Sequence, residues 1–262
     1  MVSKIKTKFI NSLRYKKYRD RHNAYVVEGE KIITELLRQD LHRTNILFTT
    51  ANWAETIDRK LLKNVQEHYV ISEDELKKLS FLKSPSKGLA VVTPPAYEVN
   101  KEAVLNSLSL VLDTIQDPGN LGTIIRIANW FGISRIFCSE DSADQFNPKV
   151  IQASMGAILR TEVYYSDLIS LLREYRIPGF PVYGTFSDGK PVYDTRVLQK
   201  GFIIFGNESK GITPGLFPYI TEKISVPNYP SGRKTMESLN ISAATAIICA
   251  EFRRRTYQGH SK

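Results

Sequence analysis

Three short segments between residues 117 and 242 combine asparagine, and in two of them glycine, with a few charged or hydroxyl side chains. They read Asp117-Pro118-Gly119-Asn120-Leu121-Gly122, Gly206-Asn207-Glu208-Ser209-Lys210-Gly211 and Ser238-Leu239-Asn240-Ile241-Ser242. In open parallel sheets ligands bind outside the carboxyl ends of the strands, and each segment follows a predicted strand. We therefore expect the three segments to meet and to orient a ligand through backbone and amide groups.

Each segment also has a plainer interpretation. Arg126 follows the first segment, off the apolar stripe of a predicted helix, and could simply pair with a surface carboxylate. The second segment could be a turn built from glycine and asparagine, and it lacks the Lys-Ser/Thr of a phosphate-binding loop. Asn240 or Ser242 could be an ordinary helix N-cap. The chain has no Gly-x-Gly-x-x-Gly either, so neither an ATPase nor a conventional dinucleotide-binding enzyme is supported.

The composition excludes several classes of protein. The chain has 262 residues and a net charge of +9, and its apolar runs fall far short of the roughly 18 residues that a membrane span needs. No apolar stretch with a cleavage site follows the basic N-terminus, so we expect neither a membrane nor a secreted protein. Cys138 and Cys249 are far apart and are expected to be small buried hydrophobes. The four histidines are scattered, and we expect no protein-bound metal.

Positive charge is concentrated near the N-terminus. Eight lysines and arginines lie between residues 1 and 22 with one acid, Asp20, and Tyr15 and Tyr18 are interleaved with them. Such a run can be a solvated face, or it can bind the phosphates of RNA through counterion release. On the second interpretation the RNA-binding residues are Arg14, Lys17, Arg19 and Arg21. A smaller cluster, Arg253-Arg254-Arg255, closes the last predicted helix.

The pattern of strands and helices predicts two α/β domains. In residues 1–95 we expect strands at 25–27, 46–48, 69–71 and 89–92, a helix at 29–38 and another that begins at Ser72. A Pro-Pro pair breaks the pattern, and a second domain follows at 106–262. Its alternation predicts a parallel sheet covered by helices, with strands at 108–112, 135–138, 182–185, 202–205 and 224–226 and helices at 120–131, 148–159 and 240–255.

Taken together, the motifs resemble those of a known family. Asn120-x-Gly122-x-x-x-Arg126, Gly206-Asn207-Glu208-x-x-Gly211 and Ser238-Leu239-Asn240-Ile241-Ser242 are similar in order and spacing to the three motifs of the SpoU (TrmH) family. That family consists of S-adenosylmethionine-dependent RNA ribose 2′-O-methyltransferases. The likeness spans the second domain, and Val26-Val27-Glu28-Gly29 and Ser86-Lys87-Gly88-Leu89-Ala90-Val91 extend a weaker one into the first.

The resemblance implies a site and an assembly. It implies a C-terminal domain with a deep trefoil knot, a homodimer, a cytoplasmic location and bound S-adenosylmethionine. Carried over by motif position, the catalytic residues are Arg126, Asn120, Glu208 and Asn240, and the cofactor-binding residues are Gly206, Val226, Leu239, Ser238 and Thr185. One departure is an apparent insertion between Pro227 and Ser238, which is basic and rich in glycine and proline.

The resemblance also implies a reaction. We expect transfer of a methyl group from S-adenosylmethionine to a ribose 2′-hydroxyl of RNA, with ribosomal RNA favoured because the first domain looks like a small RNA-binding module. Two alternatives stay open. One is a tRNA ribose 2′-O-methyltransferase, and the other is an RNA-binding protein that keeps the fold without the chemistry.

Overall fold

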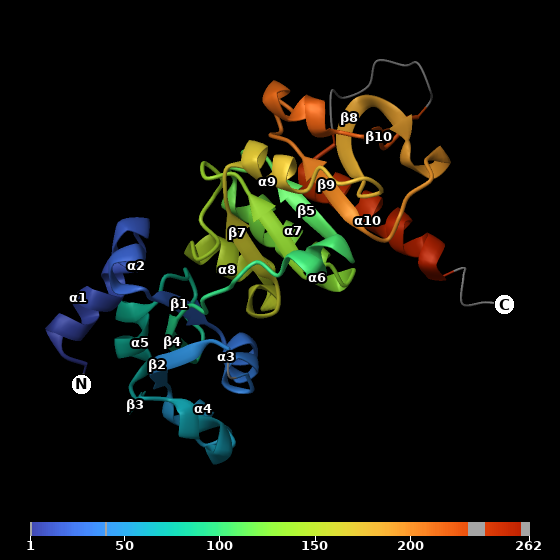
Figure 1. The fold of residues 1–262 in the computed structure, drawn as a ribbon. Helices are drawn as coiled ribbons and strands as arrows, with labels where there is room; N and C mark the ends of the chain where they lie inside the picture. The colour runs from blue at the N-terminus through green and yellow to red at the C-terminus, as the bar shows by residue number, and fades with distance from the viewer. Residues whose placement is uncertain (1, 40, 230–238, 258–262) are drawn as a thin grey trace. The chain divides into compact units, whose positions relative to one another are not determined.

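The computed structural model describes residues 2–39, 41–229 and 239–257 of the chain (Figure 1). The chain divides into two compact units. Unit 1 comprises residues 1–96 together with 144–159, and unit 2 comprises 97–143 together with 160–262. The two stretches of unit 1 are separated in sequence by the first strands of unit 2.

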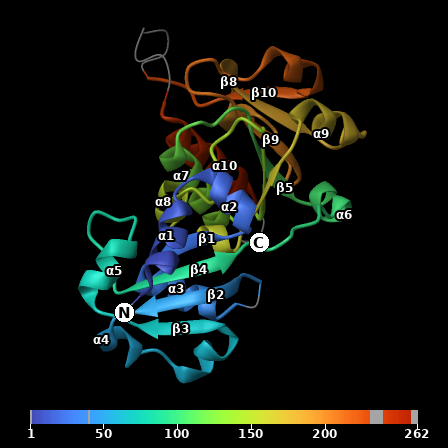
Figure 2. The ribbon, with the colours of Figure 1, turned by 90° about the vertical axis from the view of Figure 1, so that its left-hand side faces the viewer.

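Unit 1 is built around a four-stranded sheet whose order is β1-β4-β2-β3 (Figure 2). Strands β1 and β2 pair antiparallel with β4, whereas β2 and β3 run parallel. Its elements are α1 (Lys4–Ser12), α2 (Lys16–His22), β1 (Tyr25–Glu28), α3 (Glu30–Leu37), β2 (Arg43–Thr49), α4 (Ala51–Ala54), η1 (Arg59–Asn64), β3 (Glu67–Val70), α5 (Glu73–Leu79), β4 (Gly88–Thr93), α8 (Pro148–Ser154) and η2 (Ala157–Leu159).

Local sequence explains where the helices of unit 1 begin. Ser72 caps α5 through a capping box with Glu75, so two free N–H groups of the first turn are satisfied. Ile10 of α1 and Leu76 of α5 pack with Phe48 of β2 in one buried cluster. Burial of these apolar side chains against the sheet holds the helices on its face.

Residues 144–159 lie within the range predicted for the second domain, but in the structure they pack with unit 1. The ring of Phe146 stacks on Tyr25 of β1, with the centroids 4.4 Å apart. The predicted helix 148–159 is also interrupted, because Met155 (φ 49°) and Gly156 (φ 92°) adopt positive φ and end α8. This packing depends on ring contacts between residues distant in sequence.

Unit 2 contains a six-stranded sheet in which every pairing is parallel, in the order β10-β8-β9-β5-β6-β7. The parallel sheet predicted for the second half of the chain is thus confirmed. Its elements are α6 (Lys101–Leu105), β5 (Leu108–Leu112), α7 (Pro118–Trp130), β6 (Arg135–Cys138), β7 (Glu162–Tyr165), α9 (Leu168–Glu174), β8 (Val182–Pro191), η3 (Val192–Asp194), β9 (Gly201–Phe205), η4 (Pro214–Tyr219), β10 (Glu222–Ser225) and α10 (Ile241–Tyr257).

Helices lie on both faces of this sheet (Figure 1). On one face, Leu171 and Leu172 of α9 join a core with Phe202 of β9. On the other, Tyr183 of β8 packs edge-on against Phe252 of α10, with ring centroids 5.0 Å apart. A parallel sheet buried on both sides positions the loops at its carboxyl edge rigidly.

The predicted core residues of α7 and both cysteines are buried. Leu121, Ile124, Ile125 and Ala128 form the buried stripe of the helix, as their spacing predicts. Cys138 and Cys249 are free thiols in the core, and burial raises the pKa of Cys249 to about 12. Neither sulfur is therefore a reactive thiolate at neutral pH. No helix among the described residues is both long enough and apolar enough to cross a membrane.

Candidate functional site

The candidate site lies at the carboxyl edge of the six-stranded sheet. The segment 113–122 leaves β5, the segment 206–211 leaves β9, and Val226 follows β10. Because all six strands are parallel, these exits share one edge, which is where open α/β sheets bind ligands.

The first segment is shaped by the start of α7. Asp117 is the N-cap and its carboxylate accepts a hydrogen bond from the Asn120 N–H at 2.8 Å, while Pro118 occupies the first turn, where its missing N–H costs nothing. The helix begins two residues earlier than the predicted 120–131. This places the Asn120 side chain in the first turn, facing the exits of the neighbouring strands.

A continuous set of side-chain hydrogen bonds joins the three segments. The Asn120 Nδ2 group donates to Glu208 Oε1 at 2.6 Å, and Asn120 Oδ1 accepts from Asn240 Nδ2 at 3.1 Å. The hydroxyl of Ser242 also donates to Asn120 Oδ1, at 3.3 Å. The prediction that the three segments meet is confirmed, and Asn120 is the residue at which they meet.

The loop after β9 is closed on itself. Asn207 and Gly211 form a two-residue antiparallel bridge, and Asn207 Oδ1 accepts from the N–H groups of Ser209 and Lys210. A Cβ on Gly206 would lie 2.3 Å from the carbonyl carbon of Gly211, so no side chain fits there. This geometry fixes the position of Glu208 on the loop.

Sequence reasoning missed the residues that support this loop from beneath. Asp113 Oδ2 accepts from the Thr213 N–H at 2.6 Å, and the carbonyl of Thr114 accepts from Asn207 Nδ2 at 2.9 Å. Thr114 has φ 60°, an unfavourable conformation for a β-branched residue, and its N–H and hydroxyl are held by Ser139 and Asp141. The sequence signal that could have identified these residues is the pair Asp113-Thr114, which directly follows a buried strand.

Arg126 lies outside this set of hydrogen bonds. It is exposed, and among the described residues it has neither an ion pair nor a side-chain hydrogen bond. Six residues turn a helix by roughly 240°, so Arg126 and Asn120 project from different sides of α7. The structure thus brings Asn120, Glu208 and Asn240 together and leaves the guanidinium of Arg126 open to a ligand.

The residues expected to bind a cofactor surround the same edge. Leu239 is 53% exposed although it is apolar, and Val226 is half-buried. The hydroxyl of Thr185, at the bend of β8, donates to the Ile204 carbonyl at 2.9 Å. Ser238 and most of the apparent insertion lie outside the described residues. Among those described, no cluster of three His, Cys, Asp or Glu side chains could hold a metal ion.

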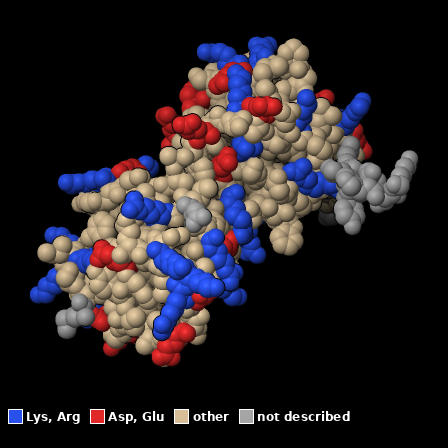
Figure 3. Space-filling model, turned by 60° about the horizontal axis from the view of Figure 1, so that its bottom comes forward, with Lys and Arg blue, Asp and Glu red and all other residues tan. Residues whose placement is uncertain are grey.

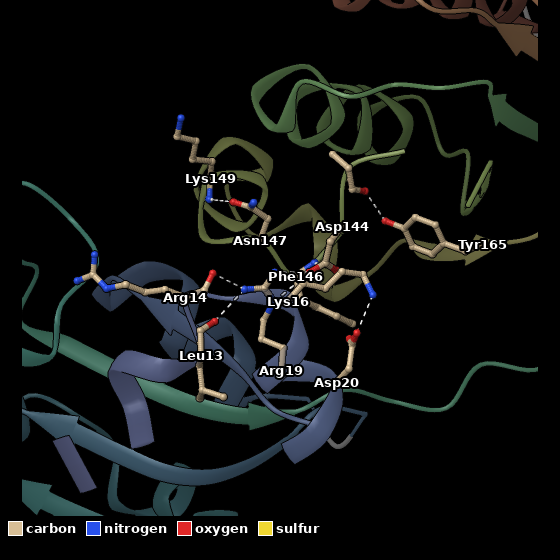
Figure 4. Close-up of polar contacts among 11 residues, drawn as sticks. Leu13, Arg14, Lys16, Arg19, Asp20, Asp144, Phe146, Asn147, Lys149 and Tyr165 are labelled. Carbon is tan, nitrogen blue, oxygen red and sulfur yellow. Dashed lines mark hydrogen bonds and ion pairs between the residues drawn. The ribbon is translucent and has the colours of Figure 1, made fainter. Parts of the chain in front are cut away.

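The four basic residues expected to bind RNA have different environments in unit 1. Arg14, Lys17 and Arg21 are exposed, whereas Arg19 is buried, with 5% of its surface accessible. Arg19 pairs with Asp144 and donates to the carbonyls of Leu13 and Arg14 (Figure 4). Arg19 therefore has a structural role beneath the surface, where its guanidinium donates to oxygens of the protein.

The surface charge of unit 1 and one of its buried carboxylates show the same difference between exposed and buried charged side chains. Lysine and arginine outnumber the acidic side chains on the face of unit 1 that Figure 3 shows. Glu28, at the end of β1, is buried and accepts from the Phe81 N–H at 2.7 Å, and its burial raises the pKa of its carboxyl group. In unit 2, Arg253 donates to the Phe131 carbonyl at 2.7 Å, so this member of the C-terminal basic cluster caps α7.

Comparison with protein families matches both halves of the chain. The SpoU rRNA Methylase family matches residues 107–250, and the MRM3-like substrate binding domain matches residues 4–90. A curated relative, the 23S rRNA guanosine 2′-O-methyltransferase RlmP of Bacillus subtilis, is 30% identical over 249 residues, which cover 95% of this chain and 96% of the relative.

Solved structures share the fold over nearly the whole chain. A TrmH-family protein from Porphyromonas gingivalis is 37% identical, with a TM-score of 0.86 over 97% of this chain and 99% of that one. The SpoU methyltransferase AviRb from Streptomyces viridochromogenes, solved with AdoMet, has a TM-score of 0.81 at 23% identity, over 97% of this chain and 99% of that one. At that identity the likeness to AviRb concerns the fold alone.

Replacement of Arg19 tests the division between buried and exposed arginines. The Arg19→Ala variant leaves Asp144 buried without its partner, so we expect a loss of about 3–5 kcal/mol in the free energy of unfolding. Arg21→Ala is the matched control, because Arg21 is exposed on the same helix, and it should change stability by less than about 0.5 kcal/mol. Urea unfolding measures both, and equal effects would contradict the assignment.

Proposed function

We propose a methyl-transfer reaction on RNA for this chain, which belongs to the SpoU rRNA Methylase family. The chain is an S-adenosylmethionine-dependent RNA 2′-O-methyltransferase that modifies a ribose hydroxyl of ribosomal RNA. The observation that carries the proposal is the hydrogen-bond chain from Glu208 through Asn120 to Asn240 and Ser242. It unites three segments that are 88 and 120 residues apart at the edge where a parallel sheet binds its ligand.

The residues at this edge fit S-adenosylmethionine. An adenosine offers an apolar ring face and polar edges, and the residues available here are the exposed apolar side chain of Leu239 and the loops that follow β9 and β10. We propose that Gly206, Val226 and Leu239 hold the donor, with Ser238 and Thr185 beside them. When bound, the donor supplies a methyl group activated by a sulfonium.

Arg126 is the residue we propose at the reacting oxygen. The ribose hydroxyl is a weak acid, so negative charge develops on its oxygen as its proton passes to water, while the new oxygen–carbon bond forms and the carbon–sulfur bond of the donor breaks. An arginine guanidinium keeps its proton at neutral pH, which makes it a poor base but a permanent donor for an alkoxide or an adjacent phosphate. Its guanidinium has no protein partner among the described residues, so this charge is available to the substrate.

Asn120, Glu208 and Asn240 are proposed to position the loops around the substrate. Glu208 accepts from Asn120, so the carboxylate orders the first turn of α7 directly. A hydrogen bond with one charged partner contributes about 1.5–3 kcal/mol, enough to keep one arrangement of the loops. Positioning of reactants can lower a barrier by roughly 7–11 kcal/mol in favourable cases, and an activated methyl group needs little else.

We propose that residues 1–95 form the substrate-binding domain and residues 106–262 the catalytic domain, except that the segment 144–159 belongs with the substrate-binding domain, since it packs in unit 1. Arg14, Lys17 and Arg21 are exposed and can contact phosphates, while Arg19 supports them from beneath. The names of the matched family and of the relative from Bacillus subtilis favour ribosomal RNA over tRNA. We propose a cytoplasmic location for the enzyme, as the family resemblance implies.

We further propose the knot and the homodimer that the family resemblance implies. The hydrogen bonds that join 206–211, 240–242 and α7 are consistent with a chain threaded through itself, and a crystal structure with an unknotted trace would contradict this.

The homodimer is supported by Trp130, which is 83% exposed one helical turn after Arg126. A large apolar side chain on an open helix face is typical of an interface.

A methylation assay tests the reaction. Purified protein incubated with radiolabelled S-adenosylmethionine and separate pools of unmodified rRNA and tRNA should transfer label to rRNA alone. Alkaline hydrolysis should then fail at one position, because a 2′-O-methyl group removes the hydroxyl that attacks the phosphate. Label in tRNA would reassign the substrate, and label on a base would contradict ribose methylation.

Replacement of Arg126 tests its role at the oxygen. Loss of one preorganised donor costs about 2.7–4 kcal/mol in other enzymes, so Arg126→Ala should lose about a hundred-fold or more in turnover. Donor affinity, measured by calorimetry, should not change. Arg176→Ala, which removes another exposed arginine of unit 2, is the control. Near-normal turnover of Arg126→Ala would refute the role.

Replacement of Trp130 tests the dimer. Light scattering should give twice the chain mass for the wild type at micromolar concentration, and Trp130→Glu should shift the protein toward monomer because it buries a charge. Leu198→Glu alters a residue of unit 2 that is 39% exposed and serves as the control. A monomeric wild type would show that the proposed interface does not form.

A further inference from the structure

The corner between α1 and α2 exposes an aromatic ring that packing does not explain. Here the chain turns through Leu13, Arg14 and Tyr15; Leu13 is fully buried, but Tyr15 is 64% exposed. Among the described residues the Tyr15 ring has no aromatic or cation–π contact, whereas Lys17 lies over the ring of Tyr18 at 4.9 Å. The free ring face of Tyr15 is therefore open to a flat partner.

The backbone of this corner is held without any help from the Tyr15 side chain. Arg19 Nη1 donates to the carbonyls of Leu13 at 2.8 Å and Arg14 at 2.7 Å. The same guanidinium is anchored by Asp144, which also accepts from the Phe146 N–H at 3.0 Å (Figure 4). The Tyr15 carbonyl accepts from the N–H groups of Tyr18 and Arg19. A ring on so rigid a support loses little entropy when it binds.

Exposed cations flank Tyr15 in the sequence. Arg14, Lys16, Lys17 and Arg21 are exposed on either side of it in the chain, and Lys149 of α8 is exposed on the segment that Asp144 and Phe146 attach to unit 1. In Figure 4 the side chains of Arg14 and Lys149 extend away from the buried pair of Arg19 and Asp144. The only acid between residues 13 and 22 is Asp20, which Lys16 pairs at 2.8 Å.

We propose that this corner binds an unpaired nucleotide of the RNA substrate, with the base stacked on Tyr15 and the flanking phosphates on Arg14, Lys17 and Lys149. An exposed ring inside a cationic surface offers a stacking platform for any base, because every base has a π-face. A paired base keeps its faces inside the helix, so the ring selects single-stranded RNA over duplex. The proposal rests on the proposed function, because it names the part of the RNA that unit 1 recognises.

Replacement of Tyr15 in the full chain provides the test. Fluorescence anisotropy with a labelled short oligouridylate should show that Tyr15→Ala weakens binding by roughly 5- to 150-fold, the range for loss of one stacked base. Tyr15→Trp should bind at least as well as wild type, since it restores a ring. An RNA duplex of the same length, measured at the same salt concentration, should bind the wild type more weakly than the oligouridylate does. The Tyr15→Ala substitution should change the affinity for this duplex little.

Two further variants separate stacking from charge. Lys149→Gln should reduce the slope of log affinity against log salt by about 0.7, the share of one phosphate contact on a single strand. Tyr193→Ala removes a tyrosine of unit 2 that is 46% exposed, and it should leave the binding of the oligouridylate unchanged. Thermal melting of Tyr15→Ala should match the wild type, because the side chain is at the surface.

Unchanged affinity of Tyr15→Ala for the oligouridylate, or a wild type that prefers duplex, would overturn the proposal. Failure of the proposed function looks different: the wild type would then transfer no methyl group to any RNA while the Tyr15 effect on binding persisted. If methylation of rRNA is normal in Tyr15→Ala at low RNA concentration, the corner does not take part in substrate recognition, and the proposal fails while the reaction stands.

Discussion

The candidate site depends on one side chain, Asn120, that both donates and accepts at the carboxyl edge of a parallel sheet. Its amide nitrogen reaches Glu208 and its oxygen receives Asn240. An amide offers both roles in one planar group, whereas an ionised aspartate only accepts and leucine does neither, so either replacement would leave a neighbour unpaired. The exits of β5 and β9 and the start of α10 are fixed relative to one another by this group.

The support beneath that group explains why the loops can be precise. Thr114 is held at positive φ because Ser139, Asp141 and Asn207 satisfy its N–H, hydroxyl and carbonyl groups. The strain of such a residue costs of order 1–3 kcal/mol and persists only where the surroundings determine it fully. The sheet therefore fixes the position of the loop that carries Glu208. The charge of Arg126 is not paired within the described residues.

Unit 1 uses charge in two separate ways. The buried pair of Arg19 and Asp144 holds the α1–α2 corner and the segment 144–159 together, and it is satisfied within the protein. The cations around Tyr15 are exposed, and although Lys16 pairs with Asp20 and Arg14 donates to the Ser80 carbonyl, their side chains remain accessible to a polyanion. A sequence shows both sets as one basic run, although burial gives them opposite roles.

The sequence by itself determined the parallel sheet, the buried stripe of α7 and the three segments of the site, because hydrophobic periodicity and loop residues are local properties. It gave no sign of β7 and α9 as separate elements, and it assigned residues 144–159 to the second domain. Only the tertiary structure decided that Phe146 stacks on Tyr25, that Arg19 is buried, and that Glu208 bonds to Asn120 and not to Arg126. Each of these outcomes depends on which distant side chains come within a few ångströms, and that distance is set by packing, which local spacing does not encode.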